Sequence, residues 1–339
     1  MEAVSQLAVG GACKPEHKLR ASWVLDLRLL AAVVAVALAA AARWRRGWLK
    51  PSTLEAWPSS LGCTEMYSPP GSMLILLCLS AMHPGLQAHM AVSVSLAAFI
   101  WSIVLASRYA GAKGALLYMC AVPSTLILLG ERLEGVGALL CSAAVLSCAA
   151  GRVLTSAFLL GASGSFSMLP LLAAPPLLVG LGGRRALRAS LALACGYLCV
   201  SSPVWLAFPS LTAGYYRHVA ESAWRLRPTS LALLPLAAAV TAALSWLALR
   251  SKRVEGLCAA SGLMWVPLAS GGGSEVASLL PLVAACQPSY PLLLLFDGAN
   301  VATQLVEHAL CSRILWHVGL VLLAALLYSC AGRGAEVES

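Results

Sequence analysis

The chain has 339 residues, of which 60% are hydrophobic and only 11% are charged, and its mean hydropathy is +0.82. Soluble domains average about 25% charged residues, so this composition excludes an ordinary water-soluble protein and makes the bilayer the solvent for most of the chain. The net charge of +9 comes from short Arg-rich stretches. In a membrane setting these indicate contact with lipid headgroups and argue against a nucleic-acid partner.

The apolar runs predict an all-α, polytopic transmembrane bundle, because a helix satisfies its own backbone hydrogen bonds inside lipid. A polar segment (1–22) precedes the membrane domain (23–330), and a polar tail (331–339) follows it. Runs near the length of a crossing predict roughly ten spans. In chain order they are 23–42, 71–82, 88–107, 114–129, 135–150, 153–180, 186–208, 229–249, 254–269, the Pro-broken 278–296, and 314–329.

Two proline-containing stretches, His83–Leu86 and Pro170–Leu178, interrupt the apolar pattern. Broken helices at membrane depth are tolerated where protein or a water-filled cavity surrounds them, so a hydrated cavity is expected. Basic residues flank the first span on both sides, which leaves its orientation open. Arg184, Arg185 and Arg188 form the clearest cytoplasmic stretch later in the chain.

The few acidic residues are the informative ones, because an ionisable group in a membrane domain is by default a functional hypothesis. The first group lies in "KPSTLEAWPSSLGCTEMYSPP" (50–70), which contains Glu55, Glu65 and Tyr67. Pro69 and Pro70 predict the start of the second span, since proline at a first helical turn loses no needed hydrogen bond. Tyr67 then belongs to the interfacial aromatic belt. Glu65 is either a helix N-terminal acid or part of a site.

Glu131, Arg132 and Glu134 form the second group, in "LLGERLEGVGALL" (128–140). The two acids are three residues apart and share a helix face. They suit either a site or a short solvated turn whose acids favour the next helix N-terminus.

The third group is "LTAGYYRHVAESAWRLRP" (211–228), where aromatic residues alternate with Arg217, Arg225 and Arg227. This composition is typical of an amphipathic segment in the headgroup layer, and arginine also pairs well with phosphate. The last group is "LFDGANVATQLVEHALC" (295–311), where Asp297 begins a polar stripe at helical spacing. Such a stripe faces a cavity, a neighbouring helix or, in an interfacial helix, water. No spacing of ligands predicts a metal site, and no cofactor is indicated.

Three stretches together resemble the GT-C superfamily of integral-membrane glycosyltransferases, especially the polyprenol-linked mannosyltransferases, including the type that adds the first mannose to GPI. They are "EMYSPPGSMLILL" (65–77), "VPSTLILLGERLEGVGALL" (122–140) and "GRVLTSAFLLGASGSFSMLPLLAAPPLLVG" (151–180). The segment 215–231 also falls where the family has a lipid-facing loop. The likeness covers most of residues 23–249, by layout and short motifs.

The resemblance implies transfer of mannose or another hexose from a polyprenyl-phosphate donor to a lipid- or protein-linked acceptor. Such transfer needs a base for the acceptor hydroxyl and cationic or metal help for the departing phosphate. Glu65 or Glu55 is the expected base. Substrate binding is expected from Tyr67, Glu131, Arg132, Glu134, Arg217, Arg225, Arg227 and Asp297. The membrane would be the endoplasmic reticulum in a eukaryote and the plasma membrane in a prokaryote.

Two departures from the family pattern keep a second interpretation open. The usual Asp after the first span is replaced by "RWRRGWLK" (43–50), and the usual basic residue before the Pro-rich helix by "SFSM" (165–168). A non-catalytic membrane subunit that keeps the fold would explain both. A transporter is a third interpretation, but it predicts two matching halves with interrupted helices, which the sequence does not show.

Overall fold

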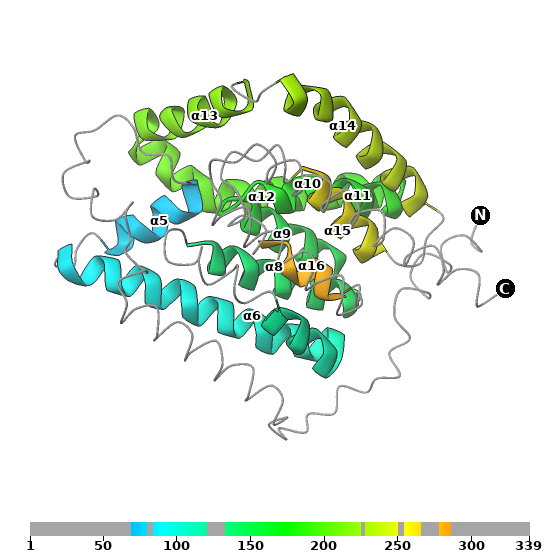
Figure 1. Ribbon diagram of the computed structural model, residues 1–339, viewed down its shortest axis with the longest axis horizontal. Coiled ribbons are helices and arrows are strands. Elements are labelled where there is room, and N and C mark those ends of the chain that lie inside the picture. Colours follow the sequence, from blue (N-terminus) through cyan, green and yellow to red (C-terminus); the bar gives the residue numbers. More distant parts are fainter. Residues whose placement is uncertain are drawn as a thin grey trace.

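A computed structural model describes residues 69–79, 84–120, 133–224, 228–249, 254–265 and 278–285 of the chain (Figure 1). These residues form α-helices and the turns between them, and no strand occurs within these ranges. The all-α prediction is therefore confirmed for this part of the chain. The predicted spans at 23–42 and 314–329 lie outside the described residues, so the expected total of about ten spans remains a prediction.

The first described helix, α5 (Pro70–Leu79), begins at the second of the two prolines, as their tolerance for a first helical turn predicts. The next helix, α6 (Pro84–Cys120), starts at the proline of the predicted interruption. The sequence predicts two spans in this region, at 88–107 and 114–129, and the structure corrects that division. One helix of 37 residues runs through the polar stretch between them. That stretch has one glycine, Gly111, and no proline, and an isolated glycine costs a helix only about 1 kcal/mol.

The middle of the chain contains α8 (Glu134–Ala149), α9 (Val153–Gly164), α10 (Leu169–Ala173), α11 (Pro175–Leu181) and α12 (Gly183–Ala207). The predicted interruption at Pro170–Leu178 is confirmed, because two short helices replace one long span there. Proline lacks the N–H that continues a helix, and the consecutive Pro175 and Pro176 separate α10 from α11. Gly182 and Gly183 have positive φ angles of 63° and 47°, which turn the chain from α11 into α12.

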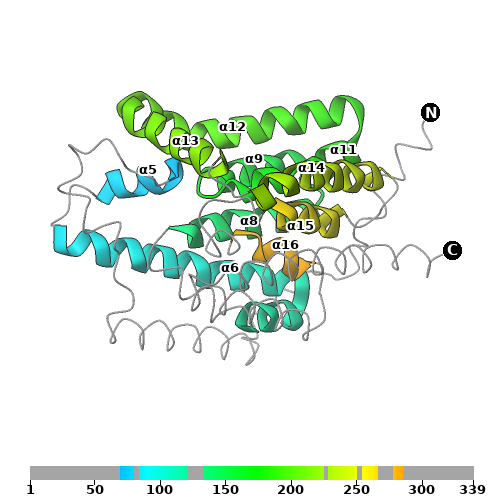
Figure 2. The ribbon, with the colours of Figure 1, turned by 45° about the horizontal axis from the view of Figure 1, so that its top comes forward.

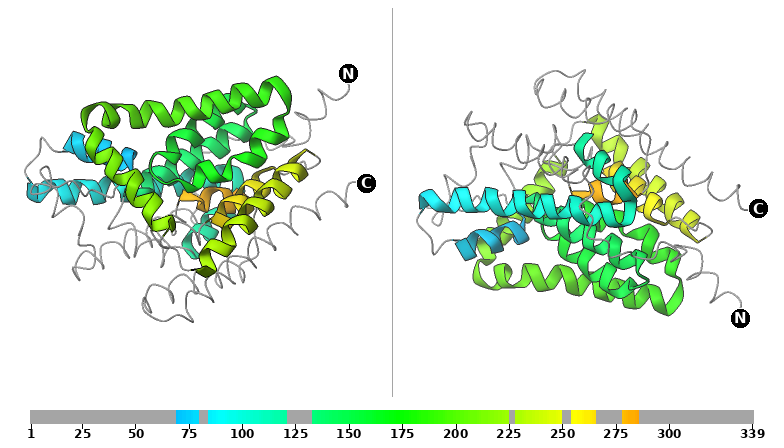
Figure 3. Two further views of the ribbon diagram at one scale, coloured as in Figure 1. Left: turned by 90° about the horizontal axis from the view of Figure 1, so that it is seen from above. Right: turned by 90° about the horizontal axis from the view of Figure 1, so that it is seen from below.

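The later helices are α13 (Pro209–Trp224), α14 (Pro228–Ala248), α15 (Val254–Trp265) and α16 (Leu280–Ala285). In Figure 2, α6, α8, α9 and α12 lie one above another, with α8 and α9 between the two long helices. In Figure 3, the green helix α12 borders one side of the molecule, and the olive helices α14 and α15 lie away from it.

Contacts between helices show which pairs of helices run in the same direction. α6 and α8 run parallel, since Ser95 lies against Gly135 and the Ser142 hydroxyl donates to the Ser102 carbonyl seven residues further along. α9 and α12 also run parallel. The carbonyl of Leu193, near the middle of α12, lies against Gly161 in the last turn of α9. Phe166, just after α9, and Val204, near the end of α12, belong to one buried cluster.

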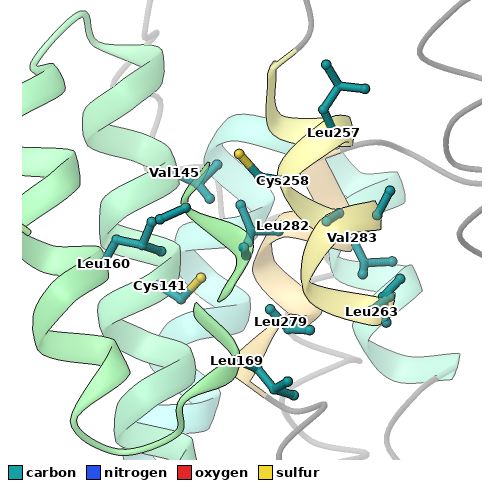
Figure 4. Close-up of a cluster of buried hydrophobic side chains, with 14 of the residues drawn as sticks. Cys141, Val145, Leu160, Leu169, Leu257, Cys258, Leu263, Leu279, Leu282 and Val283 are labelled. Atoms are coloured by element: carbon teal, nitrogen blue, oxygen red, sulfur yellow. The ribbon is translucent and has the colours of Figure 1, made fainter. Parts of the chain in front are cut away.

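The largest buried cluster joins α8 and α9 to the short helices and to α15 and α16 (Figure 4). Its members are small or aliphatic, which allows short helices to pack closely without large side chains between them. Those drawn with labels are Cys141, Val145, Leu160, Leu169, Leu257, Cys258, Leu263, Leu279, Leu282 and Val283.

Two of the described helices are long and apolar enough to cross a membrane: residues His89–Ala110 of α6 and the whole of α12. Their apolar windows are only 44% and 22% buried against the rest of the described chain. A core helix of a soluble protein would be mostly buried, whereas α12 exposes many of its large apolar side chains. These are Leu187, Leu191, Leu198 and Leu206.

Candidate functional site

Three stretches that the sequence analysis singled out meet at one end of the helix assembly. Met73 of α5, Leu133 immediately before α8, and Tyr215 of α13 pack in a single buried cluster. Phe166, which follows α9, and Val204 of α12 complete its centre. We call this region the aromatic end. The entry to α5, the entry to α8 and the amphipathic segment are thus brought together, as a shared site requires.

Glycine allows α5 to approach the end of α9. The Gly71 backbone N–H donates to the Ser165 carbonyl oxygen over 2.9 Å. A Cβ atom on Gly71 would lie 2.7 Å from the Ser165 hydroxyl oxygen and 2.9 Å from the Phe166 ring. These separations are below van der Waals contact, so only glycine fits this position without movement of its neighbours.

Glu134 is the first residue of α8 and is only 1% exposed. The alternative of a solvated turn is therefore wrong for this residue, although its place in the first helical turn does suit an acid. A carboxylate there is favoured by the positive end of the helix dipole. Leu133, the N-cap residue, has no side chain that could cap the helix. Ser95 of α6 takes that role, because its hydroxyl oxygen accepts a hydrogen bond of 3.3 Å from the Gly135 N–H.

An aromatic group links α12 to α13 beside this cluster. The hydroxyls of Tyr197 and Tyr216 hydrogen-bond to each other. The Trp205 ring meets each of these rings edge-on at 6.1 Å between centroids, and Tyr215 meets Tyr216 at 5.3 Å. The Trp205 indole N–H is buried and has no hydrogen-bond partner among the described residues. The aromatic end therefore combines ring faces with an available donor.

Tyr197 and Trp205 belong to the aromatic end but are not among the residues predicted from the sequence. Both lie in an apolar run, where an aromatic side chain is typical of ordinary packing. A signal was present, since residues 197 and 205 lie eight positions apart and so share one face of a helix. On α13, Tyr215 is buried, Tyr216 is half-buried and the next residue, Arg217, is exposed. That gradient is the one expected of an amphipathic segment.

The stretch Ser165–Met168 stands where the resemblance implies a basic residue, and the structure shows it to be part of the core. Ser165, Phe166 and Ser167 are all buried. The Ser165 hydroxyl donates to the Ala162 carbonyl, and the Ser167 hydroxyl oxygen accepts from the Leu169 N–H. These hydrogen bonds satisfy both hydroxyls within the turn itself. None of the four residues is charged, so the stretch adds no charge to the aromatic end.

Of the predicted site residues, the structure places Glu134 and Arg217, on α8 and α13. The others lie outside the described residues: Glu55, Glu65, Tyr67, Glu131, Arg132, Arg225, Arg227 and Asp297. Within the described ranges, no three His, Cys, Asp or Glu residues gather in a way that could hold a metal ion.

The aromatic end combines the kinds of group that bind a ligand with both apolar and polar parts. The tyrosine and tryptophan rings provide flat apolar faces, the indole N–H and tyrosine hydroxyls provide hydrogen bonds, and Arg217 provides an exposed positive charge on the same helix as Tyr216. Neither a protein-family model nor a curated protein matches this chain.

Proposed function

We propose that this chain is a multi-pass integral-membrane glycosyltransferase that transfers mannose or another hexose from a polyprenyl-phosphate donor. The observation that supports this most is the meeting of α5, α8 and α13 in one buried cluster. Three of the four stretches that carry the predicted site residues enter or include these helices. A transferase that binds donor and acceptor at the same time needs residues from several helices to lie close together.

Insertion in a membrane is supported by the exposure of α12. A 25-residue apolar helix in which only 22% of the hydrophobic window is buried would expose much apolar surface to water in a soluble protein. Lipid removes that cost. The endoplasmic reticulum is the proposed location in a eukaryote and the plasma membrane in a prokaryote.

The proposed roles follow from charge. Glu65, or Glu55 in its place, acts as the base that takes the proton from the acceptor hydroxyl. Arg217, Arg225 and Arg227 bind the donor phosphate, since guanidinium groups hold phosphate through paired hydrogen bonds. Residues with a carboxylate or hydroxyl group, together with Arg132, bind the sugar and the acceptor. These are Tyr67, Glu131, Glu134 and Asp297.

A non-catalytic subunit of a membrane transferase is the second candidate, and one observation favours it. The buried Ser165–Met168 stretch provides no cation where the family has one. In this alternative the aromatic end still binds a polyprenyl lipid, and a partner subunit supplies the catalytic groups.

The test is transfer from radiolabelled polyprenyl-phosphate mannose and glucose by the purified full chain in lipid nanodiscs. The proposal expects transfer by the wild type and a loss of roughly 10²–10⁴-fold in Glu65→Gln, because glutamine keeps the size of glutamate but cannot accept a proton. Glu338→Gln, in the polar tail, is the matched control and retains full activity.

Full activity in the Glu55→Gln/Glu65→Gln double variant would overturn the assignment of the base. If the wild type binds polyprenyl phosphate but transfers no sugar from any donor, the enzyme proposal is wrong and the chain is a non-catalytic subunit.

A further inference from the structure

The end of the molecule opposite the aromatic end carries a set of exposed arginines. Arg152 precedes α9, and Arg184, Arg185 and Arg188 lie in the first two turns of α12. All four are exposed. We call these four residues the basic end.

The packing of α9 on α12 brings these arginines to the same level. The helices are parallel and touch where the Leu193 carbonyl lies against Gly161. Arg152 lies nine residues before Gly161, and Arg184 lies nine residues before Leu193. At 1.5 Å per residue, both therefore lie about 14 Å from the contact point along the helix axes. Exposed Arg108 of α6 lies near this level too, since the register of α6 on α8 pairs it with Cys148.

Positive charge dominates this part of the chain. No Asp or Glu occurs in the sequence between Glu134 and Glu221. Glu134, the one acid whose side chain the structure describes, belongs to the opposite end, because Leu133 packs with Phe166 beyond the end of α9. In the sequence, Glu255, the second residue of α15, is preceded by Arg250, Lys252 and Arg253, so basic residues outnumber acids along that stretch as well.

The arginines are continuous with an exposed apolar surface. Arg184, Leu187, Arg188 and Leu191 follow the i, i+3, i+4, i+7 spacing and form one stripe along α12. Leu187 is 63% exposed and Leu191 is 58% exposed. The same side of the helix continues through exposed Cys195 and Leu198. A stripe that begins with guanidinium groups and continues with leucines matches a lipid, with a charged headgroup above and acyl chains below.

We infer that the basic end binds anionic phospholipid headgroups through Arg184 and Arg188, with Arg152 and Arg185 beside them, while Leu187 and Leu191 contact the acyl chains. The inference rests on the membrane insertion in the proposed function but on no step of sugar transfer. Each arginine near an anionic surface adds about fivefold to the affinity, so the pair accounts for roughly 25-fold. A soluble phosphate would use only the guanidinium groups, and the exposed leucines favour the lipid.

The test is native mass spectrometry of the full chain in detergent, titrated with phosphatidylglycerol and, separately, with phosphatidylcholine. Wild type is expected to prefer phosphatidylglycerol, and Arg184→Gln/Arg188→Gln to bind it about 25-fold more weakly. The charge-preserving Arg184→Lys/Arg188→Lys retains most of the preference. Leu206→Gln, a change to glutamine at an exposed position near the other end of α12, retains all of it.

Equal binding of phosphatidylglycerol by the wild type and the glutamine pair would overturn the inference. If the double variant does not fold, the single variants Arg184→Gln and Arg188→Gln are measured. If neither of them binds phosphatidylglycerol about fivefold more weakly than the wild type, the inference is overturned. Displacement of the lipid by glycerol 3-phosphate would instead show a site for soluble phosphates. Membrane insertion is tested separately by washing membranes with alkaline carbonate, which leaves an inserted protein in the membrane fraction. This result distinguishes a failure of the proposed function from a failure of the present inference.

Discussion

The hydrogen bond of 2.9 Å from the Gly71 N–H to the Ser165 carbonyl joins the first turn of α5 to the turn that ends α9. These two residues are far apart in the sequence, yet the contact determines where the chain enters the described helix assembly. The close approach of α5 to Ser165 and Phe166 also explains why glycine follows the two prolines. The N–H groups of a first helical turn have no partner inside the helix, and here one of them finds its acceptor on another helix.

Gly71→Ala is expected to lower the stability of the fold by about 1–3 kcal/mol, because the new methyl group would lie within 3 Å of Ser165 and Phe166. The midpoint of thermal unfolding in detergent measures the change. Gly137→Ala is the matched control. Its methyl group would lie 3.1 Å from the Phe166 Cβ atom and should cost less. An unfolding midpoint for Gly71→Ala equal to that of the wild type would contradict the close contact.

The crossing of α9 and α12 should be more sensitive still. A Cβ atom on Gly161 would lie 1.9 Å from the Leu193 carbonyl oxygen, and one on Gly196 would lie 1.9 Å from the Phe158 carbonyl oxygen. Backbone atoms cannot rotate away as side chains do, so either alanine must separate the helices. Small residues that allow backbones to approach are typical of helix interfaces in membranes.

We therefore expect Gly161→Ala and Gly196→Ala each to reduce the yield of monodisperse protein sharply, and the double variant to be little worse than either single one. The first separation of the helices already relieves the second clash, so the two effects are not additive. Size-exclusion chromatography of the detergent extract measures this. Ala194→Ser, on the exposed side of α12, adds one heavy atom without a clash and serves as the control. Additive losses would show that the two glycines act independently.

Ser261 should stabilise the break between α10 and α11. The Leu172 carbonyl would bond to the N–H of residue 175 or 176 in a continuous helix, but both are prolines. The Ser261 hydroxyl donates to this carbonyl over 2.9 Å instead. Ser261→Ala leaves a buried acceptor without this donor, which is expected to cost about 1–3 kcal/mol in the free energy of unfolding.

Ser190→Ala is the matched control for that change. Its hydroxyl donates to the Ala186 carbonyl within α12, which the helical i→i−4 pattern already satisfies. Thermal unfolding should therefore show a lowered midpoint for Ser261→Ala alone. Equal midpoints for the two variants would mean that another group satisfies the Leu172 carbonyl.

Local sequence rules predicted two helix boundaries at prolines, although Pro203 and Pro235 lie inside α12 and α14 without ending them. The start of α5 at Pro70 and the break before Pro175 both follow from a missing N–H and a fixed φ. The same rules failed for α6, where a polar stretch without proline looked like a loop. Polarity at Arg108 and Lys113 does not break a helix, since both residue types favour one.

The candidate site was only partly predictable, for a different reason. Glu134 was selected because acids are rare in this chain, and rarity is visible in a sequence. Its burial was not visible, because helices distant in the sequence pack around the start of α8, where Gly135 contacts Ser95 of α6 and Leu133 packs with Tyr215 of α13. Tyr197 and Trp205 were missed because an aromatic side chain in an apolar run has no signature until a partner such as Tyr216 is placed beside it.

Glu134→Gln separates a role in the fold from a role in the site. Glutamine keeps the shape of glutamate but removes the charge at the start of α8, whose interaction with the helix dipole contributes up to about 2 kcal/mol at a buried position. If the carboxylate binds a sugar hydroxyl, the loss of a charged acceptor should weaken substrate binding by roughly 10–100-fold, since hydrogen bonds to charged groups contribute about 1.5–3 kcal/mol. The measurements are the thermal unfolding midpoint and the KM for polyprenyl-phosphate mannose. A large fall in the midpoint with an unchanged KM would assign Glu134 to the structure of the aromatic end and remove it from the site.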